Sequence, residues 1–478
     1  MPSENRTTVE PRARNLSRRR VLKTVALAAG GISINAVSPI ILSGDQVFEV
    51  NRSFWSTALP SSNKALATNL DADVVVIGGG FTGLSAAYYL RKRLPGKRVV
   101  LLEAKSCGNG ASGRNGGMVL TLTESRYMRP SEDPDTDRRL YDLTAGNIRL
   151  LKALSTELGV DCELEQNGAL QVLNTADDLA NAASFVERAR DQGFPFELWN
   201  RERTAATIGS KIYQGAMFDP RSGQVHPGKL VALWKTAAMR EGVDIYDHTP
   251  VVNIEEGAIH RIETATGYVV RAPTLVLATN AYTSKLGYLH GAVAPVFDYV
   301  AITPVLTEAQ LASIGWKTLI PFNDSRTEVY YAGLTRDRRI HFGGGPVDYS
   351  FDDGVREWPD ARMRYAGLIR EFTRVFPSIA HVGIENAWGG SVDMSLDGEP
   401  SLGTLGRYRN IFYGIGFSGQ GVNLTSTFGR IIADLVAGRR EEWNWLPFLD
   451  RLPPYIPNEP FRWLGIRAAL AYTRLTER

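Results

Sequence analysis

The segment from Asp73 to Met118 constrains the fold more than any other part of the chain. Asp73 to Ile77 is rich in β-branched residues, a composition typical of a strand buried on both faces. A G-x-G-x-x-G turn follows, and the helical segment from Phe81 to about Arg93 comes next. Its first glycine permits a tight turn, the second admits a pyrophosphate, and the third lets helix and strand pack closely. The pattern predicts a dinucleotide-binding βαβ unit.

The second half of this unit supplies the expected ribose contact. Arg98 to Leu102 reads as the next strand, and Glu103 at its end can accept hydrogen bonds from ribose hydroxyls. The amides and positive dipole end of the preceding helix favour the pyrophosphate. The predicted contacts in this unit are Gly78, Gly80, Phe81, Thr82, Gly83, Glu103 and Ala104.

Two further glycine-rich segments indicate a flavin dinucleotide. One is the small-residue loop 110–117, GASGRNGG, and the other is NIFYGIGFSGQGVN at 410–423, read as strand, turn and helix to about Ala437. The second helix N-terminus would favour the negative charge of a reduced flavin. Arg114 and Asn115 could bind near the flavin ring or serve only to fold their loop. The predicted contacts are Ala111, Ser112, Arg114, Asn115, Gly116, Gly117, Met118, Gly416, Ser418, Gly419, Gln420, Gly421 and Val422.

These blocks resemble the D-amino-acid oxidase/glycine oxidase superfamily of FAD enzymes, and most of all its γ-glutamylputrescine oxidase-like branch. The similarity covers roughly residues 73–438 and includes GASGRNGGMV, ATNAYTSKL, RRIHFGGG, WGGSVDMSLDGEPSLG and GFSGQGV. It implies that Val251 and Ala278 also contact FAD. The chain departs from the branch at Gln420, usually histidine, and at Ser395, usually threonine. Since no histidine stands in the 110–117 loop, where some relatives attach the flavin, noncovalent FAD is expected.

Charge argues against a nucleic-acid partner. The chain has 478 residues, 44% hydrophobic and 22% charged, with a sequence pI near 8.7. Residues 1–23 contain seven Arg and Lys against two Glu, or +5, whereas the whole chain is +3. The remainder is therefore net acidic, at −2. Two cysteines define no disulfide framework.

The basic N-terminus suggests export. Ser17 to Lys23 reads SRRRVLK and resembles a twin-arginine motif, and a modestly apolar run follows from Thr24 to Leu42. A basic tail before a buried helix is the alternative. The leader predicts a periplasmic or otherwise exported protein, with cleavage and peripheral membrane association left open. Leader and scaffold together also resemble the exported L-amino-acid oxidases of cyanobacteria, which prefer basic amino acids.

We expect an α/β protein in which a doubly wound Rossmann-type FAD domain is interleaved with an α+β substrate domain carrying a largely antiparallel sheet. The FAD domain is expected at 70–150, 213–290 and 386–440, and the substrate domain at 151–212 and 291–385. A leader would occupy 1–42 and a C-terminal tail 441–478.

The resemblance implies amine oxidation by hydride transfer to the flavin, with oxygen or a quinone as electron acceptor and with no metal and no acid–base dyad. An arginine could clamp a substrate carboxylate in a bidentate pair. The substrate-side candidates are Arg339, Tyr331, Tyr330, His226 and Trp388, each with a purely structural alternative. Three hypotheses stay open: an amino-acid oxidase, perhaps for basic L-amino acids and releasing keto acid, ammonia and hydrogen peroxide; a γ-glutamylputrescine-type or other secondary-amine oxidase or dehydrogenase; and a non-catalytic flavin-binding protein. Substrate chirality and oligomeric state cannot be predicted.

Overall fold

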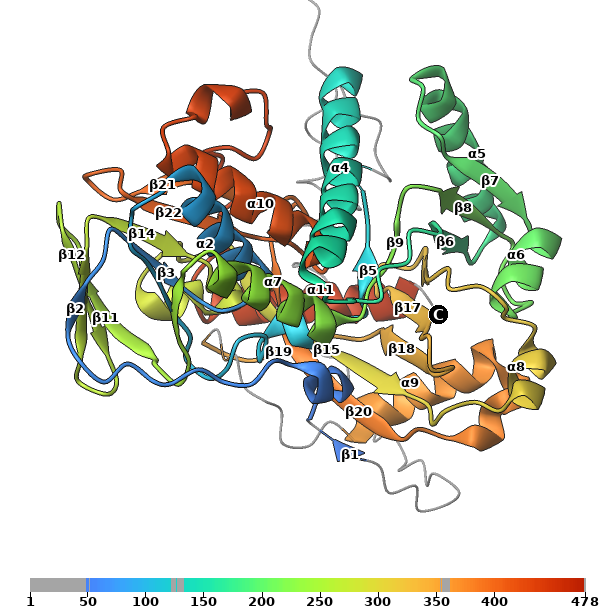
Figure 1. Ribbon diagram of the computed structural model, residues 1–478. Coiled ribbons are helices and arrows are strands. Elements are labelled where there is room, and N and C mark those ends of the chain that lie inside the picture. Colours follow the sequence, from blue (N-terminus) through green and yellow to red (C-terminus); the bar gives the residue numbers. More distant parts are fainter. Residues whose placement is uncertain are drawn as a thin grey trace, which may run out of the picture.

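The computed structural model describes residues 49–50, 52–121, 126, 133–352, 354 and 362–476. The predicted leader at 1–42 lies outside these residues. Figure 1 shows the two larger sheets with their helices, and the strands of these two sheets come from alternating stretches of the chain.

The first sheet contains the predicted dinucleotide unit. Five of its strands run parallel and a sixth is antiparallel at one edge. Every residue of β3 and β4 is buried, as the β-branched composition of these strands predicts. The order is β10 (Asp244–Tyr246), β4 (Val99–Leu102), β3 (Val74–Ile77), β14 (Thr274–Leu277), β22 (Ile411–Ile415) and β21 (Ser401–Leu405).

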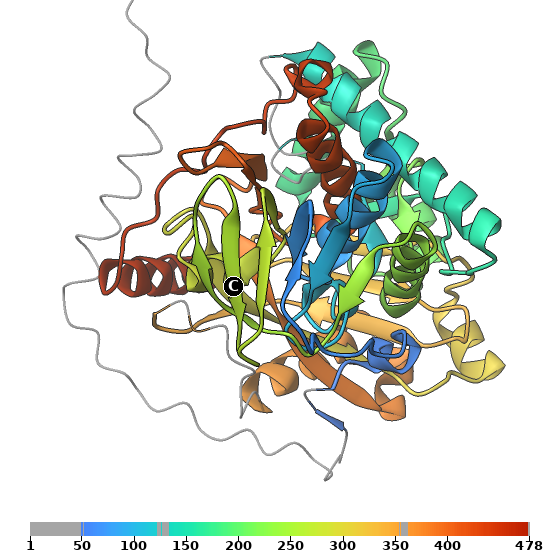
Figure 2. The same cartoon turned by 60° about the vertical axis from the view of Figure 1, so that its left-hand side comes forward.

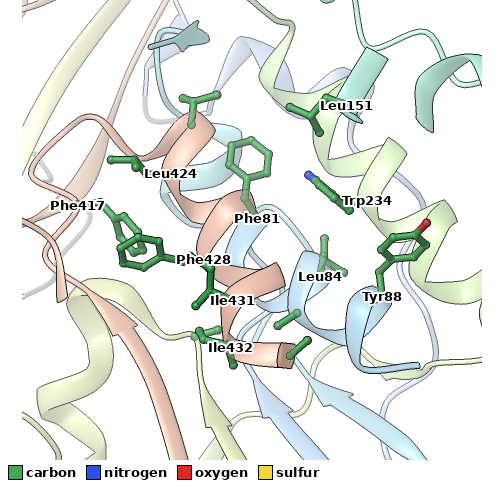
Figure 3. Packing of buried hydrophobic residues seen from close by; sticks show 14 of the residues in the cluster. Phe81, Leu84, Tyr88, Leu151, Trp234, Phe417, Leu424, Phe428, Ile431 and Ile432 are labelled. Carbon is green, nitrogen blue, oxygen red and sulfur yellow. The ribbon is translucent and has the colours of Figure 1, made fainter. Parts of the chain in front are cut away.

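Helices cover one face of this sheet and a small sheet covers the other (Figures 1 and 2). Figure 3 shows the helical side, where Phe81 and Leu84 lie close to Phe428, Ile431 and the ring of Trp234. The helices are α2 (Phe81–Arg93), α4 (Pro134–Leu158), α7 (Pro227–Arg240) and α10 (Gly421–Val436). The small sheet has the order β11 (Val251–Glu255), β12 (His260–Thr264), β13 (Val269–Ala272) and β2 (Leu70–Asp71).

The second sheet has ten strands and is largely antiparallel. Apolar residues on one of its faces form a separate core with α8 (Glu308–Ile314) and α9 (Arg362–Val375), so the other face is the one turned toward the FAD domain. The order is β1 (Glu49–Val50), β20 (Asn386–Met394), β15 (Ala294–Ile302), β18 (Ile340–Gly344), β17 (Tyr330–Leu334), β16 (Phe322–Asp324), β6 (Ala169–Leu173), β8 (Gly215–Asp219) and β7 (Glu197–Asn200), with β19 (Asp348–Tyr349) beside β15.

The predicted fold class is therefore confirmed, but two domain boundaries need correction. Residues 215–219 and 386–394, which the sequence places in the FAD domain, form β8 and β20 of the second sheet. Both strands directly precede cofactor-side segments, which explains the misassignment. The predicted tail contains a further helix, α11 (Phe461–Thr476). Within the described residues, no helix combines the length and apolarity needed to cross a bilayer.

Candidate cofactor and substrate site

The first glycine turn has the close contacts expected of a dinucleotide fold. Gly78 adopts φ +106°, and a β carbon there would lie 2.5 Å from the carbonyl oxygen of Ala278. A β carbon on Gly83 would lie 1.9 Å from the carbonyl oxygen of Gly78. Gly80 is the N-cap of α2, and its backbone faces the side chain of Ser112. Only glycine fits at 78 and 83, so the turn brings helix and strand into direct contact.

Two helix N-termini meet at one edge of the parallel sheet. The strands β3 and β22 both pair with β14 in parallel, so the helices that follow them, α2 and α10, begin at the same edge. Neither N-cap residue, Gly80 or Gln420, makes a side-chain cap hydrogen bond, and neither helix has an acidic residue in its first turn. A β carbon on Gly419, just before α10, would meet nothing within 4 Å. Two helix N-termini without acidic residues, one of them beside open space, fit an anionic cofactor that spans both helices.

Glu103, the expected ribose contact, directly follows β4. Its two carboxylate oxygens accept hydrogen bonds from the backbone N–H groups of Gly79 (2.7 Å) and Lys105 (2.9 Å). Ala104 lies between Glu103 and Lys105 in the chain. The chain leading into β11 runs alongside, with the N–H of Thr249 donating to the carbonyl of Glu103 at 2.8 Å. The structure thereby brings Val251, two residues later, to the same end of the site.

The 110–117 loop is folded by its own polar side chains. The Asn115 amide donates to the carbonyls of Ala111 and Ser112 and accepts from the N–H of Gly117. Arg114 donates to the carbonyls of Asn109 and Gly389, both at 2.9 Å. The Ser112 hydroxyl accepts from the N–H of Phe81, so the loop is tied to the start of α2. These contacts support the loop-folding role for Asn115 and place Arg114 between the two sheets.

Two buried tryptophans donate hydrogen bonds to the backbone of the same loop. Trp388 donates from Nε1 to the carbonyl of Arg114 at 2.9 Å, and Trp55 donates to the carbonyl of Asn115 at 2.8 Å. The two indoles pack edge to face, 5.7 Å apart. Trp388 is fully buried, so it supports the loop from the core side.

Tyr331 lies between the second sheet and the loop. Its ring lies over Gly343 of the adjacent strand, and its hydroxyl donates to the carboxylate of Asp298 at 2.9 Å. A β carbon on Gly116 would lie 2.5 Å from the same ring. Tyr330 points to the opposite face, because neighbouring strand residues alternate, and packs on Arg326 and Phe342. The two tyrosines therefore do not share a pocket.

Arg339 and His226 are both held by other protein groups, and His226 packs edge to face on Trp55 with ring centroids 4.9 Å apart. Arg339 pairs with Asp337 at 2.9 Å and Glu385 at 2.8 Å, donates to the carbonyl of Thr303, and lies over the ring of Phe54. His226 caps α7 by accepting from the N–H of Lys229, and burial lowers its pKa.

The second glycine turn is organised by a buried acid. The Oδ2 atom of Asp393 accepts from the N–H of Gly416 at 2.6 Å, and its carbonyl accepts from the N–H of Ser418. Burial raises the pKa of Asp393 to about 7, although the N–H groups of Gly416 and Phe417 oppose that shift. Ser395 contacts the Ser418 hydroxyl at 3.1 Å, so this departure from the branch pattern lies beneath the turn.

A small cavity adjoins the second turn. It has a volume of about 30 Å³ and lies between Gln420, the N-cap of α10, and strands β6, β8 and β16. We call it the amide cavity, because three primary amides line it. Its lining residues are Gln171, Asn323, Gln420, Asp219, Ser222, Leu120, Ala169, Leu170 and Met217.

The amide cavity has one fixed carboxylate. Asp219 accepts hydrogen bonds from Thr121, Tyr141 and Ser222 and from the backbone N–H of Arg221. No lysine or arginine is among the described residues that line the cavity. Its polar surface is therefore made of amides, a hydroxyl and an acid.

Sequence reasoning missed Gln171, Asn323 and Asp219. They lie on three different strands, and Asn323 meets Gln171 only through the parallel pairing of β16 with β6. No local motif surrounds them, and the one usable signal is that a polar residue interrupts the apolar strand 169–173.

Comparison with known proteins shows the family of the chain. A family model described as "DAO: FAD dependent oxidoreductase" matches residues 73–435. The chain is 31% identical to γ-glutamylputrescine oxidoreductase of Escherichia coli (strain K12), over 81% of this chain and 89% of that protein. It is 30% identical to the probable oxidoreductase OrdL of Haemophilus influenzae, over 77% of this chain and 84% of the relative.

Glycine oxidase of Geobacillus kaustophilus is 26% identical over 79% of this chain and 96% of that protein. The crystal structure of glycine oxidase from that organism superposes with a TM-score of 0.68, at 23% identity, and covers 81% of this chain and all of the other. That likeness concerns the fold. The family match spans both glycine turns, and the chain belongs to the DAO family of FAD-dependent oxidoreductases, which act on amines and amino acids.

Proposed function

We propose that the protein oxidises an amine that is recognised without a carboxylate clamp, as the name of its γ-glutamylputrescine relative suggests. The observation that carries this proposal is the chemistry of the amide cavity, which presents Asp219 and no described cation. A substrate carboxylate beside Asp219 would face a like charge, whereas an ammonium group or an amide would be favoured.

Bound FAD supplies the hydride acceptor for oxidation of the carbon next to the amine nitrogen. The chain's own residues bind and orient the substrate. Gln171 and Asn323 lie side by side on paired strands and both line the cavity. Gln420 also lines it at the N-terminus of α10, so a water-sized polar group of the substrate, such as an ammonium group, would enter the cavity next to the second cofactor turn.

An amino-acid oxidase is the second candidate, because glycine oxidase is among the relatives. It would need a partner for the substrate carboxylate, and Arg339 is the arginine among the substrate-side candidates. The ion pairs of Arg339 with Asp337 and Glu385 weaken that assignment, since both acids would compete with a substrate carboxylate.

Anaerobic bleaching of the flavin in the purified holoprotein discriminates these functions. Putrescine, γ-glutamylated amines and α-amino acids would be compared as substrates. Asn323→Leu keeps the side-chain size and removes the amide, so we expect about a tenfold rise in KM for the preferred amine. Arg339→Lys is the control, because Arg339 does not line the amide cavity, and it should leave KM and kcat for that amine unchanged.

Preference for amino acids, together with a raised KM in Arg339→Lys, would establish the amino-acid oxidase instead. A flavin that no substrate bleaches would indicate a non-catalytic protein. Peroxide release measured in air separates oxygen from a quinone as the acceptor.

We also propose that FAD is held noncovalently. The loop 110–117 contains no histidine, and Cys107 is buried with its pKa raised by desolvation, so it is a poor nucleophile. Acid precipitation should release all of the flavin into the supernatant as intact FAD. Flavin remaining with the pellet would contradict this.

A further inference from the structure

The helix α11 presents an apolar face to solvent. Phe461, Leu464, Tyr472 and Leu475 are 71%, 54%, 54% and 68% exposed. Their spacing places them on one stripe of a helix with 3.6 residues per turn. Figure 2 shows α11 at the left edge of the molecule, with its first turns clear of the neighbouring ribbons. Single exposed apolar residues are common, but a full stripe on one helix marks an interaction surface.

The orientation of this stripe is fixed by contacts on the other side of α11. Trp463 and Ile466 pack against a small core that contains Tyr349 and Ile456. Glu459 accepts from the N–H of Trp463 at 2.9 Å and from the Tyr349 hydroxyl at 2.6 Å. The stripe therefore cannot turn inward without breaking this anchor.

The charged residues of α11 itself are all arginines, and Arg467 is the exposed one beside the stripe, because Arg462 is buried and Arg474 pairs with Glu328 at 3.2 Å. Between Phe461 and Thr476 the helix contains three arginines and no acidic residue. From Arg451 to Arg478 there are five arginines and two glutamates, although the chain after residue 23 is net acidic. Arg467 lies next to the stripe with its guanidinium 4.9 Å from the ring of Trp463.

We propose that the outer face of α11 docks on the surface of an anionic lipid bilayer. An apolar helix face with aromatic residues and an exposed arginine beside it, here Arg467, is an arrangement that lies in the membrane interface. The apolar side chains would enter the acyl boundary, while Arg467 would stay at the headgroup level. The docking is peripheral, and it does not depend on the proposed substrate.

Co-sedimentation of the FAD-loaded full chain with vesicles tests this surface. Vesicles of equal parts phosphatidylcholine and phosphatidylglycerol would be compared with phosphatidylcholine alone. Leu464→Glu/Leu475→Glu should lower binding to the anionic vesicles about tenfold or more. The control Leu150→Glu/Met239→Glu adds the same charge at side chains 43% and 50% exposed on α4 and α7, and should bind like the wild type. Equal binding by both double variants would overturn the proposal.

A label at the stripe gives a second readout that other membrane contacts cannot mimic. Both native cysteines are buried, so an environment-sensitive dye can be attached at Leu464→Cys or, as the control, Leu150→Cys. Anionic vesicles should shift the emission to the blue at 464 and leave 150 unchanged. A blue shift at 464 already present in buffer would show that protein, such as a second copy, covers the stripe. That result, or no shift with vesicles, would refute bilayer docking.

Discussion

At the scale of single residues, Gly83 is a position that should tolerate no side chain. Because an added β carbon would clash with the backbone of Gly78, the clash cannot be relieved by a rotamer change. We expect Gly83→Ala to lower the free energy of unfolding by about 2 kcal/mol or more and to reduce bound FAD. Gly110→Ala is the control, since a β carbon there meets nothing within 4 Å and should change stability by less than about 0.5 kcal/mol. Urea unfolding and the flavin-to-protein absorbance ratio measure both effects.

Asp393 should make stability depend on pH. Its folded pKa of about 7 lies above the ordinary value, so the native state binds the extra proton. This contribution is fully present below pH 4 and is lost as pH rises through 7. Relative to Asp393→Asn, which stays neutral, the wild type should lose roughly 2–4 kcal/mol between pH 4 and 8. Urea titrations at several pH values give that difference, and a constant difference would show that the acid ionises normally.

At the scale of elements, the loop 110–117 depends on tryptophans from elsewhere in the chain. Trp388→Phe keeps an aromatic ring and removes the N–H that reaches the carbonyl of Arg114. A hydrogen bond contributes about 0.5–1.5 kcal/mol, so the Kd for FAD should rise about three- to tenfold.

Trp316→Phe is the matched control for this prediction. Trp316 is equally buried, but its Nε1 has no partner among the described residues and lies in the core of the second sheet. FAD titration of the apoproteins should separate the two variants. Equal losses would mean that ring volume, and not the hydrogen bond, supports the loop.

Elements also explain what could be predicted from sequence. The cofactor turns are local, since each joins one strand to the next helix and its glycines lie within a few residues of one another. The substrate side is not local. Gln171 and Asn323 are brought together by strand pairing, and adjacent Tyr330 and Tyr331 point to opposite faces. Arg339 directly precedes β18, and its local sequence does not indicate that Asp337 and Glu385 form ion pairs with it.

At the scale of the whole molecule, the two sheets share the chain in alternating stretches, and the site forms where they meet. A protein of this kind completes its cofactor site only when both ends of the chain have folded, because β3 and β22 are separated by more than 300 residues and joined through β14. The twin-arginine interpretation of residues 17–23 means that export takes place after folding and FAD binding. That order agrees with a cofactor site that needs both ends of the chain.

Replacing Arg18 and Arg19 by lysine tests that interpretation. Both residues lie outside the described part of the structure, so the argument rests on the sequence SRRRVLK alone. Because the net charge is unchanged, a general affinity of a basic tail for acidic partners should persist, whereas recognition of the arginine pair should be lost. We expect the variant to stay in the cytoplasm with FAD bound, while the wild type reaches the periplasmic fraction. Fractionation followed by flavin fluorescence measures this, and unchanged export of the variant would favour the basic-tail alternative.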